Sequence, residues 1–195
     1  FIKYIFESFE SLANEKDINY TFYSEVDELI MDYDSDKVST IITNLLINAI
    51  KFSPKKEKVI IHLNKVSVNG NQHIQVKVVD TGIGLSKEEM SNVFNKFYQA
   101  DSSSSRRFGG TGIGLALTKQ LVVLMKGSIT VKSKLNKGSE FILWLPISNN
   151  ATLSETSLRD TVPISKEIPT VDSEQKDYKV FLDNEAPIAL VIEDN

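Results

Sequence analysis

Apolar residues recur every three to four positions in several stretches of the chain, a spacing typical of helices that bury one side. The strongest pattern begins at Asp34, which can cap a helix N-terminus, and ends at Phe52. Its apolar positions form one arc, made up of Val38, Ile41, Ile42, Leu45, Leu46 and Ala49. The sequence therefore predicts a helix over 34–52 with this arc in the core.

Three shorter stretches also predict helices. Residues 1–13 carry apolar side chains at helical spacing, and residues 113–125 do the same before Gly127, which can cap the end of a helix. Residues 86–94 begin with Ser and have Glu three positions later, the pattern of a capping box. We therefore expect a short helix there as well.

Alternation of apolar and polar residues predicts strands at 18–22, 29–33, 58–68, 72–80, 129–134 and 140–145. Asn69-Gly70 lies between two of these strands, and both residue types tolerate the positive φ of a tight hairpin. Residues 136–138 (Asn-Lys-Gly) predict a second hairpin in the same way. Helices that interrupt pairs of strands favour an α/β fold.

Composition narrows the class of protein. The chain has 195 residues, of which 41% are hydrophobic and 25% charged, as expected for one soluble domain with a remainder. A net charge of -4 gives no positive field for a polyanion, so nucleic-acid binding is not expected. The absence of cysteine excludes disulfides and thiolate chemistry, and two histidines are too few for a histidine-rich metal cluster.

The last part of the chain differs in amino-acid composition from the rest. Residues 148–187 are rich in Ser, Thr, Glu, Asp and Lys, which favours a flexible linker. Residues 188–195 (IALVIEDN) are apolar and then acidic, like a strand separated from its partners. No apolar run is long enough to cross a membrane and no leader sequence opens the chain. Because the chain begins with Phe1 rather than Met, we expect it to be a segment of a longer protein.

The first candidate site is a polar stripe on the helix at 34–52. Asn44, Asn48 and Lys51 are spaced by four and three residues, so they share one side of that helix. An amide oxygen can bind Mg²⁺ without adding negative charge, and a lysine one turn further on can reach phosphate oxygens. The same stripe also fits a helix side that simply faces water.

The second candidate is residues 80–85 (DTGIGL). Asp80 has the strand parity of apolar residues at 74, 76 and 78, so its carboxylate should leave the sheet on the core side. The amino group of a purine would satisfy such a carboxylate, and Gly82 and Gly84 would let a flat base approach the backbone. A strand-ending Asp that caps a glycine turn is the alternative.

The third candidate is residues 109–115 (GGTGIGL), which enter a helix directly after residues 101–110, an expected loop. Glycines and free amides at a helix N-terminus attract phosphate. The glycine spacing matches neither the Rossmann turn nor the P-loop, so both common nucleotide folds are disfavoured.

Residues 1–147 resemble the ATP-binding catalytic domain of sensor histidine kinases, in the GHKL ATPase superfamily. The resemblance rests on four motifs in a fixed order, at 44–52 (NLLINAIKF), 80–85, 94–98 (FNKFY) and 109–115. The resemblance implies a two-layer α/β sandwich of the Bergerat type. In such a fold a mixed sheet has helices on one face, and a mobile lid covers ATP. ATP and Mg²⁺ are the implied cofactors.

The resemblance also implies roles for individual residues. Asn48 would bind Mg²⁺, with Asn44 as its polar neighbour, and Lys51 would approach the phosphates. Phe52 would border the adenine, and Asp80 would accept a hydrogen bond from the adenine amino group. Gly82 and Gly84 would pack against the base.

Further roles fall at the lid. Phe94 and Phe97 would anchor its near end, although both also fit an ordinary core. Arg106 and Arg107 would clamp the γ-phosphate, unless they are simply solvated; many relatives carry an arginine where Gln99 stands. The residues that would frame the phosphates and lead into the helix are Gly110, Thr111, Gly112, Gly114 and Leu115.

Two other functions remain open. The hydrolytic ATPases of the superfamily have a glutamate where this chain has Asn44, and an amide cannot act as a general base, so fast hydrolysis is disfavoured. A nucleotide sensor without catalysis is the other alternative. The family's phosphorylated histidine has no counterpart here, because His62 and His73 fall in predicted strands. The chain should bind ATP without phosphorylating itself.

Partners follow from the same resemblance. They are a histidine-bearing dimerisation domain of the parent and a receiver domain, whose first strand residues 188–195 resemble through Glu193 and Asp194. The implied parent is a homodimeric, membrane-anchored hybrid kinase. We expect this segment itself to be cytoplasmic and monomeric.

Overall fold

A computed structural model describes residues 1–99 and 111–150, which belong to one compact unit. The elements are α1 (Ile2–Ser8), α2 (Glu10–Glu15), β1 (Asn19–Ser24), α3 (Ser35–Phe52), β2 (Lys58–Val68), β3 (Asn71–Asp80), α4 (Lys87–Asn92), α5 (Gly114–Leu124), β4 (Ser128–Lys134) and β5 (Gly138–Pro146). Within these residues, no helix is both long and apolar enough to cross a membrane.

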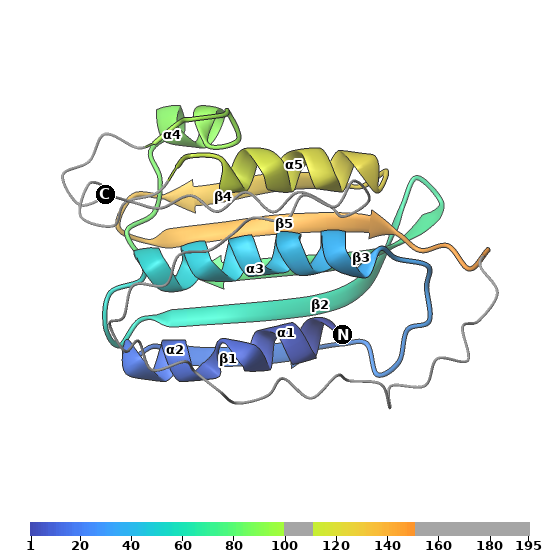
Figure 1. The fold of residues 1–195 in the computed structure, drawn as a ribbon, viewed down its shortest axis with the longest axis horizontal. Helices are drawn as coiled ribbons and strands as arrows, with labels where there is room; N and C mark the ends of the chain where they lie inside the picture. The colour runs from blue at the N-terminus through green and yellow to red at the C-terminus, as the bar shows by residue number, and fades with distance from the viewer. Residues whose placement is uncertain (100–110, 151–195) are drawn as a thin grey trace, which may run out of the picture. The chain divides into compact units, whose positions relative to one another are not determined.

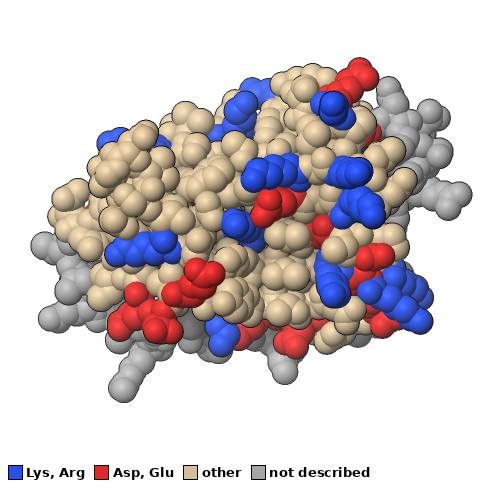
Figure 2. All heavy atoms as spheres, turned by 180° about the vertical axis from the view of Figure 1, so that it is seen from behind, with Lys and Arg blue, Asp and Glu red and all other residues tan. Residues whose placement is uncertain are grey.

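The five strands form one mixed sheet in the order β1-β2-β3-β5-β4. β1 and β2 are parallel, and the other neighbours are antiparallel. Helices α1, α2, α3 and α5 lie over one face of the sheet (Figure 1). The view from behind shows basic and acidic side chains interspersed (Figure 2). The expected two-layer α/β sandwich with a mixed sheet is confirmed.

The core lies between α3 and the sheet. All six residues of the predicted arc are buried, and Ile50 joins them. They face side chains of β2, β3 and β5 that are fully buried: Val59, Ile61, Val76, Val78 and Leu143. Asp34 caps α3 as predicted, since its carboxylate accepts a hydrogen bond of 2.9 Å from the Lys37 N–H. Both hairpins and the Ser86 capping box are also confirmed.

The predicted strand at 29–33 is wrong, because residues 25–34 form neither helix nor strand. None of the five strands in the described part of the chain pairs with this connection. The Asp32 N–H donates to the Ser148 carbonyl at 2.7 Å, and Leu29 and Met31 pack against the core. Their apolar character comes from packing rather than from a sheet.

A second difference concerns residues 1–13, where one helix was expected. The chain forms α1 and α2 with a break at Phe9, and Leu12 is exposed. The break lets Ala13 reach the core while α1 packs on β1, where the rings of Phe6 and Tyr20 stack at 3.8 Å. Helical spacing does not distinguish one helix from two short ones on the same side.

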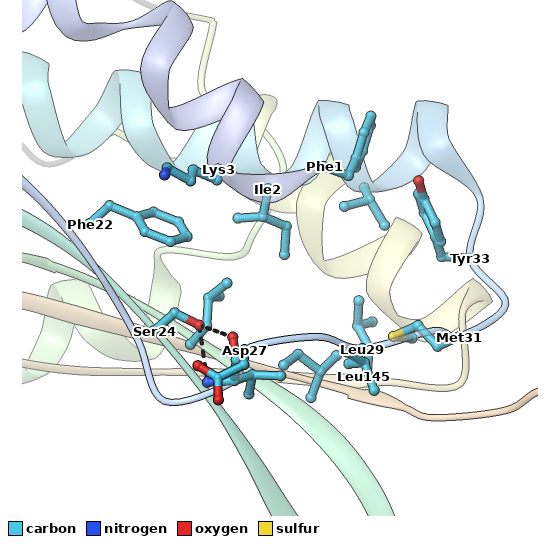
Figure 3. A pocket seen from close by; sticks show the side chains of 14 residues that line it. Phe1, Ile2, Lys3, Phe22, Ser24, Asp27, Leu29, Met31, Tyr33 and Leu145 are labelled. Atoms are coloured by element: carbon cyan, nitrogen blue, oxygen red, sulfur yellow. Dashed lines mark hydrogen bonds between the residues drawn. The ribbon is translucent and has the colours of Figure 1, made fainter. Parts of the chain in front are cut away.

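A cavity of about 510 Å³ lies between α1, the connection at 25–34 and the sheet. Phe1 and Tyr33 lie side by side at one edge, and Leu29 and Met31 form a wall (Figure 3). Leu145 of β5 reaches it from the sheet. The lining is mostly apolar.

The predicted cap at the end of α5 differs in one detail, namely which residue is left-handed. Lys126, not Gly127, adopts the left-handed conformation, with φ 57°. The N–H groups of Lys126 and Gly127 donate to the carbonyls of Val123 and Val122, both at 2.9 Å, which is a Schellman motif. Gly127 is required for another reason, since a Cβ there would lie 2.4 Å from the Trp144 carbonyl oxygen.

Candidate functional site

A second cavity, of about 600 Å³, lies at the end of the sheet where β3 ends and β5 begins. The sequence motifs that line it come from α3, from the turn after β3 and from the start of α5. It brings together most of the predicted site residues: Asn44, Asn48, Lys51, Phe52, Asp80, Gly84, Thr111, Gly112, Gly114 and Leu115. Residues as far apart in the sequence as Asn44 and Phe141 therefore share one cavity.

The polar stripe of α3 faces this cavity rather than bulk solvent alone. Asn44 lies against α5, where its amide Nδ2 donates to the Gly114 carbonyl and to the Thr118 hydroxyl, both at 3.4 Å. The Asn48 amide has no hydrogen-bond partner among the described residues. The Lys51 ammonium lies 5.1 Å from the centroid of the Phe52 ring. One amide is thus fixed by the protein, and the next is available to a ligand.

Asp80 is the only ionisable side chain among the buried residues that the structure describes, with 6% of its surface exposed. Its Oδ1 accepts hydrogen bonds from the backbone N–H groups of Gly82, at 2.9 Å, and Ser139, at 3.3 Å. Burial raises the pKa of Asp80 to about 6, although these two hydrogen bonds oppose the rise. Asp80 thus caps the glycine turn, as one interpretation predicted, and it also lines the cavity.

The glycines of the DTGIGL turn are required by the protein's own backbone. A Cβ at Gly82 would lie 2.3 Å from the Phe52 carbonyl oxygen, and one at Gly84 would lie 2.1 Å from that of Lys134. Gly84 also has φ +65°. Gly84 lines the cavity, whereas Gly82 is absent from the lining. The turn is thus pressed between the end of α3 and the β4–β5 hairpin.

Sequence reasoning missed the contribution of that hairpin. The Leu85 N–H donates to the Ser133 hydroxyl, and the Asn136 N–H donates to the Ile83 carbonyl, both at 2.7 Å. Ser139 pairs with Asp80 across the β3–β5 ladder. Ser139 lies outside the strand predicted at 140–145, and the register of β3 on β5 places it beside Asp80.

The FNKFY segment contributes less than expected. Phe97 is 73% exposed and does not line the cavity, while its N–H donates to the Gly112 carbonyl at 3.0 Å. Phe94 packs edge to face on Phe141, with ring centroids 6.2 Å apart. The predicted positions Arg106, Arg107 and Gly110 lie outside the described residues, as does the expected lid at 101–110.

The described residues hold no group of three or more His, Asp or Glu side chains that could bind a metal ion by themselves. The oxygen-bearing side chains that line the cavity are amides, hydroxyls and two carboxylates, those of Asp80 and Glu89. Such a set suits a cation that arrives with an anionic ligand.

Residues 33–149 match the family described as histidine kinase-, DNA gyrase B- and HSP90-like ATPases. Hybrid signal transduction histidine kinase D of Dictyostelium discoideum is 36% identical over 143 residues, which are 73% of this chain and 9% of that protein. Circadian input-output histidine kinase CikA of Synechococcus elongatus is 37% identical over 159 residues, 82% of this chain and 19% of that protein. The chain thus spans less than a fifth of the length of either relative.

The fold is also similar to that of solved proteins. The crystal structure of full-length ShkA in complex with AMPPNP superposes with a TM-score of 0.65 and 25% identity, covering 77% of this chain and 30% of ShkA. The catalytic domain of histidine kinase ThkA gives a TM-score of 0.64 at 21% identity, covering 76% of this chain and 92% of that domain. The architecture of the sheet and helices is therefore that of a histidine kinase catalytic domain.

Proposed function

Because the chain belongs to the family of histidine kinase-, DNA gyrase B- and HSP90-like ATPases, we propose that the cavity beside Asp80 binds Mg-ATP for transfer of the γ-phosphate to a histidine on another domain. The observation that carries the proposal is the buried Asp80 carboxylate at one side of a cavity whose other side is the polar stripe of α3. A carboxylate held in such a place needs a donor from the ligand.

Adenine recognition is assigned to Asp80. Both hydrogen bonds that the described residues donate to Asp80 end on Oδ1, which leaves Oδ2 for the exocyclic amino group of adenine. Guanine has a carbonyl oxygen at the equivalent position, and two acceptors facing each other repel. Phe52 borders the same cavity and suits the flat face of the base.

The phosphates are assigned to α3 and to the start of α5. Lys51 can meet phosphate oxygens, and residues 111–114 precede the N-terminus of α5, where free amides favour anions. Asn48 fits a Mg²⁺ ion, because its amide oxygen is a hard donor and has no partner among the described residues. When bound with ATP, Mg²⁺ neutralises phosphate charge.

Asn44 favours phosphate transfer over hydrolysis. Its side chain donates to α5 through Nδ2, and an amide cannot take a proton from water. In the proposed transfer, an imidazole nitrogen of the acceptor forms the N–P bond, and the bond from the γ-phosphorus to the bridging oxygen breaks. ADP leaves with that oxygen, and the imidazole proton goes to solvent.

The acceptor histidine is proposed to lie on a dimerisation domain of a longer parent, which passes the phosphate to a receiver domain. The hybrid kinase of Dictyostelium discoideum among the relatives supports such a relay. The proposal also includes domain boundaries at 147 and 187 and a first receiver strand at 188–195. It further includes a membrane-anchored parent and a monomeric segment.

Isothermal titration with Mg-ATP and Mg-GTP tests the nucleotide site. We expect Mg-ATP to bind and Mg-GTP to bind at least tenfold more weakly, because a mispaired buried carboxylate costs more than about 1.4 kcal/mol. Asp80→Asn should lose this preference and most of the affinity. Equal binding of both nucleotides, or unchanged binding by the variant, would contradict the assignment of Asp80.

Phosphate transfer is tested separately with γ-labelled ATP and a histidine-bearing dimerisation domain from a relative. We expect acid-labile label on that domain and little release of free phosphate without it. Rapid phosphate release in the absence of an acceptor would favour an ATPase, and binding without either product would favour a nucleotide sensor.

A further inference from the structure

The last turn of α3 presents Lys51 and Phe52 to the nucleotide cavity, yet it ends without a glycine cap. Ser53, which follows the helix, is extended, with φ −92° and ψ 124°. The final four carbonyls of any helix lack partners within the helix. How these carbonyls are satisfied therefore decides how firmly the two side chains are held.

Two of the four carbonyls are satisfied locally or by the DTGIGL turn. The Ser53 hydroxyl donates to the Ala49 carbonyl at 2.7 Å, and the Ile83 N–H donates to the Phe52 carbonyl at 3.3 Å. The other two, on Ile50 and Lys51, both receive hydrogen bonds from the ammonium of Lys16, at 2.7 and 2.9 Å. All four carbonyls thus have a donor, and one lysine supplies half of these hydrogen bonds.

Lys16 comes from a distant part of the sequence and is itself held in place. It is the C-terminal cap residue of α2, and the next residue, Asp17, accepts a hydrogen bond of 2.6 Å from the Lys56 N–H. The Asn19 N–H in turn donates to the Glu57 carbonyl at 2.8 Å. The connection after α2 is therefore fastened to the loop after α3, and a cation at the C-terminus of α3 is favoured by the helix dipole.

We propose that Lys16 is a positioning residue of the nucleotide site, which holds the last turn of α3 so that Lys51 and Phe52 meet the ligand. Lys16 does not line the cavity and acts only through α3. This inference rests on the proposed nucleotide binding. Its distinctive consequence is that a residue outside the cavity changes ligand affinity in a chain that is still folded.

The test is Lys16→Met, which keeps the length of the stem and removes all three donors. At a temperature where circular dichroism shows the variant fully folded, we expect about tenfold weaker binding of Mg-ATP, since loosened groups lose preorganisation. Lys16→Arg, which keeps the charge and the donors, should recover much of the affinity. Lys55→Met is the matched control, because Lys55 is an exposed lysine on the loop after α3, and this variant should bind Mg-ATP as the unchanged chain does.

Hydrogen exchange gives a readout that does not need the nucleotide. In Lys16→Met the amides of residues 50–53 should exchange at least several-fold faster, while those of β3 should not change. If Lys16→Met lowers only the melting temperature and leaves Mg-ATP affinity unchanged, Lys16 is structural and the inference is overturned. If Lys16→Met does not fold, the inference depends on Lys16→Arg, which must then keep both the slow exchange and the affinity. If the unchanged chain does not bind Mg-ATP, the proposed function fails instead, whatever the exchange result.

Discussion

Burial of the Asp80 carboxylate lowers the stability of the protein at neutral pH. Its pKa is 3.8 in an ordinary environment and about 6 in the folded chain, so between these pH values the folded chain holds more protons than the unfolded one. Stability must therefore fall as pH rises from about 4 to about 6, and the loss stays constant above the folded pKa. The side chain to which we assign adenine recognition thus lowers stability at neutral pH.

This cost predicts that Asp80→Asn stabilises the protein without nucleotide. The free energy of unfolding of the variant, relative to the unchanged chain, should increase by up to about 3 kcal/mol between pH 4 and pH 7, because about 2 pKa units are involved. Urea denaturation over this pH range measures it. The exposed carboxylate Glu28 offers a control, since Glu28→Gln should follow the unchanged chain. A constant difference between Asp80→Asn and the unchanged chain would argue against a raised pKa.

Two glycines with positive φ allow two costs of a substitution by alanine to be distinguished. One is the steric clash of the new Cβ with neighbouring backbone, and the other is the unfavourable φ. Gly84 and Gly70 have φ +65° and +81°, but a Cβ at Gly84 would lie 2.1 Å from the Lys134 carbonyl oxygen, whereas nothing lies within 4 Å at Gly70. We expect Gly70→Ala to cost about 1 kcal/mol and Gly84→Ala at least about 3 kcal/mol in chemical denaturation. Similar losses for both variants would mean that the DTGIGL turn moves easily.

At the scale of elements, the two long helices, α3 and α5, have different C-terminal caps. The difference matches the surroundings of each helix end. α3 ends in an extended residue with its carbonyls bound by other segments, whereas α5 ends in a Schellman motif at Lys126. A self-contained cap is sufficient for α5, whose last turn is exposed at Val123 and Leu124. The end of α3 is instead joined to the turn that bears Asp80.

The cap of α5 predicts a stabilising substitution. Lys126→Gly should increase stability by up to about 1 kcal/mol and raise the melting temperature by a few degrees, because glycine adopts φ 57° without a steric penalty. Gly127→Ala should destabilise, since its Cβ would meet the Trp144 carbonyl. Calorimetry on both variants distinguishes the two positions, and the reverse order of stabilities would contradict the observed motif.

At the scale of the whole molecule, the compact unit extends slightly beyond the sheet. After β5, the Ser148 carbonyl accepts from Asp32, and the Asn150 N–H donates to the Asp32 carboxylate at 2.6 Å. These bonds tie residues 148–150 to the connection before α3. The domain's own hydrogen bonds thus reach three residues past the boundary expected at 147.

Two truncations test this extent. A chain that ends at Leu153 should keep the melting temperature and Mg-ATP affinity of the full chain, because the compact unit ends there. A chain that ends at Ile147 should melt several degrees lower, since it loses two hydrogen bonds of about 1 kcal/mol each. Its affinity should change little, because the lost bonds lie at the other end of the sheet from Asp80. Equal melting temperatures would place the boundary at 147.

The sequence by itself determined most elements and half of the site. Local periodicity and caps depend only on neighbouring residues, so α3, both hairpins and the Ser86 cap were predictable, as was the core-side parity of Asp80. The order of four motifs then identified the family. The same local signals failed at 29–33, where an apolar run packs without a partner strand.

Only the tertiary structure determined the features that depend on contacts between distant segments, such as strand register and long-range hydrogen bonds. The register of β3 on β5 places Ser139 beside Asp80, and the crowding around Gly82 arises from the end of α3. The two carbonyls bound by Lys16 lie 34 and 35 residues away from it in the sequence. No local pattern encodes such contacts, because backbone atoms carry no residue identity and their partners are chosen only when helices and strands pack.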